Sequence, residues 1–292
     1  MYFKYILILL IKLTVSQVLA QPIPTLTLEA YKRIDKPARN EVSGITKSRT
    51  YENTFWVHGD SGTPDRIYAI NQNGGFISND KKYSGAKVKG AKNIDWEDIA
   101  LGENGTLVLA DIGNNCKCRN NLQILILEEP NPKKNKVEVL KKYKIQYPER
   151  EDWLGRLMKW NYDAEAVFQI NDIIYVLTKQ PRSTNLFKLE NPVEGEVNKL
   201  IFIDSMNTEN YVTAADVSRD GSHIAILTYN QVFIVDFSDR LLPKSKHKTA
   251  YLDGVDQIES VTFDGDRLII AEETGHLYKV KLDQLVEINQ KD

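Results

Sequence analysis

The sequence predicts an all-β fold made of repeated four-stranded units, and two observations lead to this prediction. Short apolar runs alternate with turn signals such as Asp60–Pro64 (D-S-G-T-P) and Asn71–Gly75 (N-Q-N-G-G), which are typical of hairpins. A marker at the start of an apolar run also recurs five times, which indicates an internal repeat. The markers are V-S-G-I at Val42–Ile45, W-E-D-I at Trp96–Ile99, A-E-A-V at Ala164–Val167, A-D-V at Ala215–Val217 and I-E-S-V at Ile258–Val261.

The stretch Asn93–Arg119 shows the plan of one unit. Glu97 opens an apolar run that ends at Leu101, a turn follows at Gly102–Gly105, and a second run returns to Asp111. If both runs are antiparallel strands, Glu97 and Asp111 lie side by side at one end of a hairpin.

Each unit is expected to supply up to four strands. The first unit has Glu41–Thr46, Phe55–His58, Arg66–Ile70 and a strand that begins at Gly75–Ser78; the second has Glu97–Leu101, Leu107–Asp111, Leu122–Leu127 and Val137–Tyr147. The third has Ala164–Gln169, Ile173–Lys179, Leu186–Leu189 and Lys199–Asp204; the fourth has Thr213–Ser218, His223–Tyr229, Gln231–Phe237 and Lys248–Leu252. The fifth has only Ile258–Phe263, Arg267–Glu272 and Leu277–Leu282, and helical spacing of apolar residues predicts a short helix within Glu151–Trp160.

The strand missing from the fifth unit matches an unpaired strand at Thr25–Ile34, which precedes the first marker. An N-terminal strand that completes the last unit closes the repeat into a ring and removes its free edges. We therefore predict a single β-propeller over residues 21–292, with five blades, or six because the interval between Glu97 and Glu165 is long. A β-sandwich is the main alternative, but it does not explain the repeat.

Composition and charge limit the function. The chain has 292 residues, a net charge of −2 and no basic tract, so nucleic acid is not an expected partner. Residues 1–20 read as a secretory signal peptide cleaved before Gln21, because a short apolar segment follows Lys4 and V-L-A closes it. We expect a secreted or periplasmic monomer with no membrane contact after cleavage.

Cys116 and Cys118 are the only cysteines, and one residue separates them. In an exported protein such a pair can form a small disulfide, remain as two free thiols or hold a soft metal.

The repeat predicts a ring of polar residues at one mouth of the central channel. The first strand of each blade lines the channel, and its start lies beside the end of the second strand. This pairing predicts Glu97 with Asp111, Glu165 with Lys179, Glu259 with Glu272 and Glu273, Ser43 with His58 and Asp60, and Asp216 with Tyr229.

Carboxylates this close repel one another, since two unit charges about 4 Å apart cost on the order of 4 kcal/mol at an effective dielectric near 20. They must be protonated, paired with a base or bound to a cation, and oxygen ligands favour Ca²⁺ over zinc or copper. The expected metal ligands are Glu97, Glu165, Glu259, Asp111 and Asp60, and the expected ligand contacts are His58, Arg66, Asn114, Asn115, Arg119, Lys179 and Glu272. The alternative is that the acids cap turns or form salt bridges and hold no metal.

Four motifs resemble those of a family of secreted, mostly bacterial β-propeller proteins. They are W-V-H-G-D-S-G at Trp56–Gly62, D-W-E-D-I-A at Asp95–Ala100, D-I-G-N-N-x-x-x-R at Asp111–Arg119 and D-A-E-A-V at Asp163–Val167. The family is similar to the phytase-like, gluconolactonase-like and NHL/TolB-like propellers. The resemblance implies Ca²⁺ on the axis at Glu97, Glu165 and Glu259. The chain departs from the family pattern at Gly59 and Asn114 and in its C-K-C insertion.

Two functions remain open. The first is a binding or scaffold propeller that takes a small molecule or protein at the mouth. The second is a Ca²⁺-dependent hydrolase of a phosphoester or lactone, in which Glu97 or Asp111 activates water.

Overall fold

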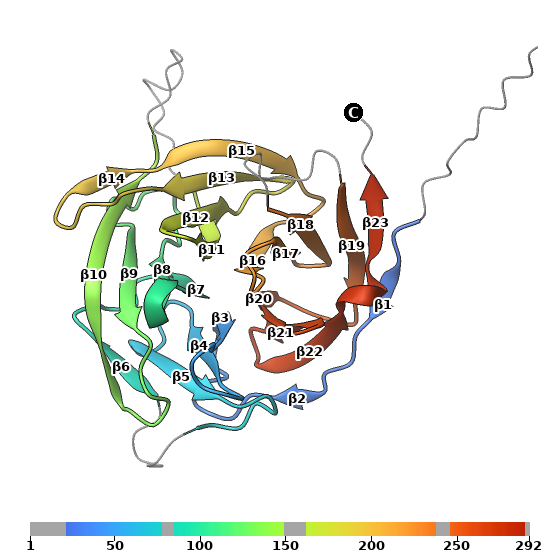
Figure 1. Cartoon of the computed structure of the whole chain (residues 1–292), viewed down its shortest axis with the longest axis horizontal. Coiled ribbons are helices and arrows are strands. Elements are labelled where there is room, and N and C mark those ends of the chain that lie inside the picture. The colour runs from blue at the N-terminus through green and yellow to red at the C-terminus, as the bar shows by residue number, and fades with distance from the viewer. Residues whose placement is uncertain (1–21, 78–84, 149–161, 238–245, 290–292) are drawn as a thin grey trace, which may run out of the picture.

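The strands form a ring of radial sheets around a central axis, which is the β-propeller architecture (Figure 1). The computed structural model describes residues 22–77, 85–148, 162–237 and 246–289. The predicted signal peptide and the helix expected within Glu151–Trp160 lie outside the described residues. No described helix is long and apolar enough to cross a membrane.

The described strands group into five consecutive four-stranded units. Unit 1 contains β3 (Val42–Lys47), β4 (Phe55–Gly59), β5 (Arg66–Ile70) and β6 (Ala86–Lys89), and unit 2 contains β7 (Trp96–Leu101), β8 (Thr106–Asp111), β9 (Gln123–Glu128) and β10 (Lys136–Gln146). Unit 3 contains β11 (Ala164–Ile170), β12 (Ile173–Thr178), β13 (Ser183–Leu189) and β15 (Ile201–Asn207), and unit 4 contains β16 (Val212–Val217), β17 (His223–Thr228), β18 (Gln231–Asp236) and β19 (Lys246–Asp253). Unit 5 contains β20 (Ile258–Asp264), β21 (Arg267–Glu272), β22 (His276–Lys281) and β2 (Lys32–Arg33).

The ring closes through its inner strands and its core. The inner strands β3, β7, β11, β16 and β20 contact one another in a cycle, with β20 beside β3. Five hydrophobic clusters fill the spaces between neighbouring units, and one of them joins Val42 and Phe55 of unit 1 to Ile269 and Leu277 of unit 5. Each sheet therefore buries both faces against its neighbours, which explains why most residues of the inner strands are buried.

The N-terminal segment closes the ring as expected, but it divides between two units. β2 pairs antiparallel with β22 and supplies the fourth strand of unit 5. β1 (Thr25–Thr27) pairs in parallel with β19 of unit 4. The single strand predicted over Thr25–Ile34 is thus wrong in detail. The segment forms two short strands instead, one paired with unit 4 and the other with unit 5.

The structure corrects the predicted outer strands in three other places. The fourth strand of unit 1 is β6 rather than a strand at Gly75–Ser78, where Phe76 makes only an isolated bridge to Ile70. Outer strands β14 (Val197–Lys199) and β23 (Val286–Asn289) were not predicted, and they pair with β10 and β19. Two 3₁₀ turns, Glu103–Gly105 and Leu282–Gln284, complete the described elements.

Candidate functional site

A β-bulge near the start of every inner strand positions the side chains at one end of the channel, which we call the start mouth. The pairing register of each inner strand with its neighbour is interrupted by one residue. A bulge inserts an unpaired residue and redirects its side chain, and such bulges are frequent next to functional sites. The bulged residues are Ser43, Glu97, Glu165, Thr213 and Glu259.

Thr213 is therefore the repeat position in unit 4, two residues before the marker A-D-V at Ala215–Val217 from which the repeat was predicted, so the predicted alignment there was wrong. Ser43 and Thr213 donate their hydroxyls to the next inner strand, to Glu97 O at 2.7 Å and to Ile258 O at 2.8 Å. The other three bulges carry glutamates.

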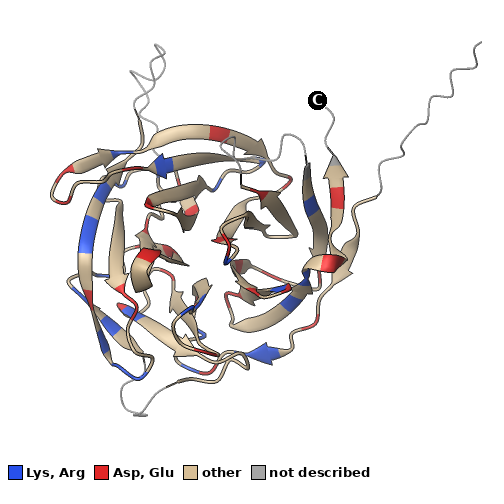
Figure 2. Ribbon diagram, in the orientation of Figure 1, with Lys and Arg blue, Asp and Glu red and all other residues tan. Residues whose placement is uncertain are grey.

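Five carboxylates gather at the start mouth, and we call them the acid cluster: Asp60, Asp95, Glu97, Asp163 and Glu165. Ligand oxygens of Asp60, Asp95 and Glu97 lie within 4.8 Å of one another, as do those of Glu97, Asp163 and Glu165. Glu97 belongs to both groups and so links them. Figure 2 shows acidic residues among the inner strands, whereas many Lys and Arg lie on outer strands such as β10.

Asp95 and Asp163 are the two members that sequence reasoning missed. Each stands two residues before a bulged glutamate, in D-W-E and D-A-E. This shared spacing lies inside the quoted motifs and is the signal that could have identified them.

Burial and mutual repulsion favour protons on these carboxyls. Burial, together with the nearby charges of Glu165 and Asp60, raises the pKa of Glu97 well above its ordinary value. Burial raises the pKa of Glu165 to about 7, although the Lys179 ammonium opposes the shift. Burial also raises the pKa values of Asp60, Asp95 and Asp163. In the absence of a cation the cluster therefore retains protons near neutral pH.

Lys179 and Tyr229 connect the acid cluster to Glu259. Lys179 Nζ lies 2.9 Å from Glu165 Oε1 and 5.5 Å from the centroid of the Tyr229 ring. The Tyr229 hydroxyl donates to Glu259 Oε1 at 3.2 Å. Burial and then Glu165 raise the pKa of Glu259 to about 8. The predicted neighbours Glu165 and Lys179 are thus brought together, and Glu259 lies at the edge of the cluster.

Asp111 is buried, but its carboxylate is already occupied by protein groups. Arg119 Nη2 lies 2.8 Å from Asp111 Oδ1, and Gln123 Nε2 donates to Oδ2 at 2.7 Å. Arg119 Nη1 also lies 3.8 Å from Asp95 Oδ2, at the rim of the acid cluster. Asp111 therefore anchors Arg119 and does not join either group of potential ligands.

The loop that carries Arg119 is tied to the acid cluster at several points. Cys116 and Cys118 form a disulfide. The backbone N–H of Asn114 donates to Asp163 Oδ1 at 2.6 Å. Asn114 is buried, whereas Asn115 is exposed. A Cβ built on Gly113 would lie 1.8 Å from Glu97 Oε1 and 2.6 Å from the Asp95 carboxyl group. Only glycine therefore leaves room for both carboxylates at this position.

Three predicted contact residues do not reach the acid cluster. His58 is fully buried against Gly44 and Trp96, and burial lowers its pKa to about 4, so it is neutral at pH 7. Arg66 lies on β5, away from the inner strands, and its Nη1 donates to Gly85 O at 2.8 Å. Glu272 accepts from His276 Nδ1 at 2.7 Å and from Tyr278 OH at 3.0 Å. The Glu272 carboxylate is thus held by side chains of β22, the third strand of its blade.

Two more buried aspartates brace the inner strands. Asp98 Oδ2 accepts from Val167 N on β11 at 2.9 Å. Asp216 Oδ2 accepts from Thr262 Oγ1 and Phe263 N on β20, both at 2.8 Å. The predicted placement of Asp216 beside Tyr229 at the mouth is wrong, because Asp216 lies near the other end of β16.

A solved structure of low sequence identity supports the fold. No protein-family model and no curated protein sequence matches the chain. Glutaminyl cyclase from Myxococcus xanthus aligns with a TM-score of 0.50 at 7% identity, over 92% of this chain and 99% of that one. Aldose sugar dehydrogenase from Streptomyces coelicolor, solved with PQQ bound, aligns with a TM-score of 0.49 at 8% identity, over 87% of this chain and 97% of that one. At such identities the likeness concerns the propeller fold alone.

Proposed function

We propose that this protein is a secreted β-propeller that binds a divalent cation, Ca²⁺ foremost, at the acid cluster, and that it acts as a binding or scaffold protein. The observation that supports this most is that Glu97 belongs to two sets of three acidic residues. Within each set the ligand oxygens lie within 4.8 Å of one another. Oxygens bound to one Ca²⁺ at 2.3–2.6 Å are separated by at most about 5 Å. The spacing within each set therefore suits one ion.

The charge balance supports a cation as well. Within the described contacts, Lys179 and Arg119 are the bases at the acid cluster, and Arg119 is shared with Asp111 outside it. Five carboxylates against these two bases leave an excess of negative charge or require protons. A divalent cation would displace the protons and remove the repulsion.

The donor set favours a hard cation. All candidate ligands are carboxylate oxygens, and no described His or Cys joins either group. Gly113 leaves the space that the Glu97 and Asp95 carboxylates occupy. Such a set suits Ca²⁺, which takes six to eight oxygens in flexible geometry, better than zinc or copper.

Thermal melts with millimolar Ca²⁺ and with chelator test this proposal. The wild type should gain about 2.7 kcal/mol at a free Ca²⁺ concentration of one hundred times Kd. Glu97→Gln should respond less to Ca²⁺, because it removes the ligand shared by both groups, yet it should be more stable than wild type in chelator, because repulsion falls. Glu196→Gln, at an exposed loop position, serves as the control and should behave as wild type. A wild type indifferent to Ca²⁺, with Glu97→Gln equally destabilised in both conditions, would refute the proposal.

A second candidate function is a Ca²⁺-dependent hydrolase of a phosphoester or lactone. The observation that favours it is the pKa of Glu165, raised to about 7, and that of Glu259, raised to about 8, because such groups exchange protons near neutral pH. Glu97 remains the candidate base, whereas Asp111 is held by Arg119 and Gln123. Assays with p-nitrophenyl phosphate and a simple lactone should then show activity that needs Ca²⁺ and is lost in Glu97→Gln. Equal rates with Ca²⁺ and with chelator would exclude this candidate.

A further inference from the structure

The channel has a second mouth, where the inner strands end, and its chemistry differs from that of the acid cluster. Lys47, Leu101 and Val217 are the last residues of β3, β7 and β16. A six-residue strand spans about 20 Å, so this end mouth is well separated from Glu97 at the start of β7. Ligands at the two mouths would not share residues.

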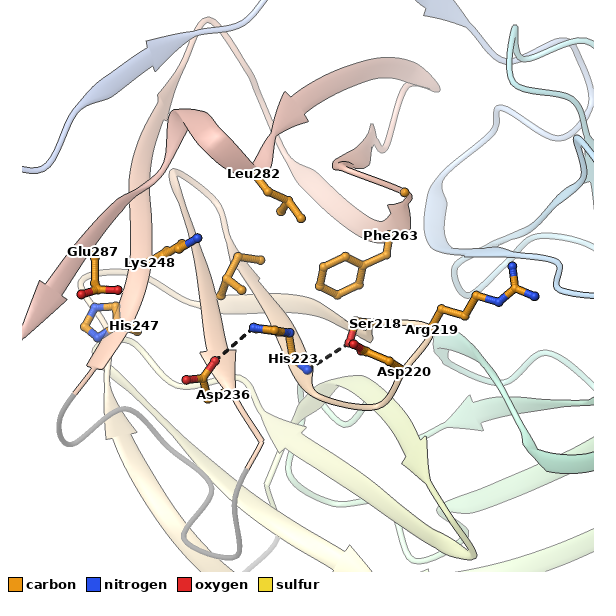
Figure 3. Close-up of a pocket in the computed structure, with 12 residues that line it drawn as sticks. Ser218, Arg219, Asp220, His223, Asp236, His247, Lys248, Phe263, Leu282 and Glu287 are labelled. Atoms are coloured by element: carbon orange, nitrogen blue, oxygen red, sulfur yellow. Dashed lines mark hydrogen bonds and ion pairs between the residues drawn. The ribbon is translucent and has the colours of Figure 1, made fainter.

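Two adjoining cavities open at the end mouth. The larger, of about 880 Å³, lies between units 4 and 5 (Figure 3). The smaller, of about 450 Å³, lies beside the loop after β3 and includes Lys47, Arg49 and Asp216 in its lining. Both are lined by Ser218, Arg219, Phe263 and Gly265. The shared residues show that the two cavities are direct neighbours.

The larger cavity has an apolar wall. Ile234 of β18 lines it together with Phe263 and Leu282 of unit 5. Phe263 and Leu282 pack against the cluster between these units while remaining partly exposed. Figure 3 shows the Phe263 ring and the Leu282 side chain on the same side of the cavity, across from His223. This wall offers a surface of the size of an aromatic ring.

Three acidic groups near the cavity, Asp220, Asp236 and Asp264, already have partners in the protein. Asp220 Oδ1 accepts hydrogen bonds from the hydroxyls of Ser218 at 2.6 Å and Ser222 at 2.7 Å. Asp236 Oδ1 lies 3.1 Å from His223 Nε2. Asp264 is paired with Lys47 and, at 2.8 Å, with Arg267. These carboxylates do not depend on the two remaining guanidinium groups.

Those two groups are Arg219 and Arg49. Within the described part of the chain, the exposed Arg219 guanidinium makes no hydrogen bond or ion pair. Among the described residues, Arg49 Nη2 donates to Ser218 O, the residue before Arg219, at 3.5 Å, and its charge also acts on the nearby buried Asp216. In Figure 3 the Arg219 side chain extends away from the apolar wall. Two arginines with spare donors thus lie at the boundary of the two cavities.

We propose that the end mouth is a second ligand site, for an organic anion that has an apolar, ring-sized body and one carboxylate, phosphate or sulfonate group. The body lies on Ile234, Phe263 and Leu282, and the anion is held by Arg219 and Arg49, whose planar groups donate in pairs to such oxygens. The larger cavity alone, of about 880 Å³, suits a small molecule, since ligand cavities commonly measure about 300–1,000 Å³.

The dye 8-anilinonaphthalene-1-sulfonate has this chemistry and is a direct probe, because its fluorescence rises on binding in an apolar site. We expect one saturable site on the native full chain. Arg219→Gln and Arg49→Gln should each weaken binding about fivefold, as expected for a partly exposed ion pair. Arg182→Gln, an exposed arginine outside both cavities, should bind as wild type does.

The neutral dye N-phenyl-1-naphthylamine separates the apolar wall from the arginines. Its affinity should be unchanged in Arg219→Gln and Arg49→Gln. Both variants should have the melting temperature of the wild type, because the substituted side chains are exposed. Addition of Ca²⁺ or chelator should leave dye binding unchanged, which keeps this site distinct from the acid cluster. Absence of saturable binding by the sulfonate dye, or equal affinity in wild type and both arginine variants, would overturn the proposal.

Discussion

Replacement of Glu259 by glutamine should change how the stability of this protein depends on pH. Glu259 lies on a bulge of β20, where burial and the charge of Glu165 raise its pKa from 4.5 to about 8. A carboxyl whose pKa is raised by folding stabilises the folded state by binding a proton. That contribution is complete below pH 4.5 and is lost as the pH rises through about 8.

The structure gives the size of the effect. The shift from 4.5 to about 8 corresponds to a loss of at most about 5 kcal/mol of folding free energy between pH 5 and pH 9, at about 1.4 kcal/mol for each pKa unit. Glu259→Gln imitates the protonated acid, and its amide oxygen can still accept the hydrogen bond that Tyr229 OH gives to Glu259. The two proteins should therefore be similar at pH 5, and the glutamine variant should be the more stable at pH 9.

Urea unfolding at each pH unit from 5 to 9, in chelator, measures this difference. Glu196→Gln is the control for removal of a carboxylate at an exposed position, and it should run parallel to wild type. Parallel curves for wild type and Glu259→Gln would show that the buried carboxyl has no raised pKa, and the reasoning would be wrong. Added Ca²⁺ should flatten the wild-type curve if the cation replaces protons at the neighbouring acid cluster.

Three other predictions concern the loop and the closure of the ring. Gly113→Ala should destabilise the fold by about 1–3 kcal/mol and remove the response to Ca²⁺ in thermal melts, because its Cβ would take the place of Glu97 Oε1; an unchanged response would contradict the fit. Replacement of both Cys116 and Cys118 by serine should cost about 2 kcal/mol or less, because the closed loop is small. The disulfide would be contradicted if a thiol reagent counted two free thiols in the unfolded, unreduced protein. Deletion of residues 22–34 removes β1 and β2, so both unit 4 and unit 5 should lose an outer strand and the melting temperature should fall sharply; unchanged melting and solubility would refute closure by the N-terminal segment.

The sequence alone was enough for the architecture, because the signals it rests on are local. Alternating apolar residues and turns such as Asn71–Gly75 depend on neighbours along the chain. Each inner strand was found close to its observed position, and the strand missing from unit 5 led to the prediction of ring closure. Figure 1 shows the two terminal regions side by side at the last units, as closure requires.

The candidate site was predictable only where the repeat itself carried it. The recurrence of Glu97, Glu165 and Glu259 placed three acids at one mouth, and two of them lie in the acid cluster. Asp95 and Asp163 occupy loops before the inner strands, and the D-x-E spacing marks both of them. The approach of Asp163 and Glu165 in unit 3 to Glu97 in unit 2 depends on how neighbouring blades pack, and no local pattern reports that packing.

Register explains the remaining errors. A shift of one residue turns a side chain to the opposite face of a sheet, and a bulge produces such a shift without a clear sequence mark. Asp111 was expected among the metal ligands, but its carboxylate accepts from Gln123 of β9 and holds Arg119. In unit 4 the bulge falls on Thr213 rather than at Ala215, which moves Asp216 from the mouth to the braced interior. The order of strands and the repeated acids were thus determined by the chain itself, whereas the choice of side chains that meet at each mouth was decided by pairing with strands distant in sequence.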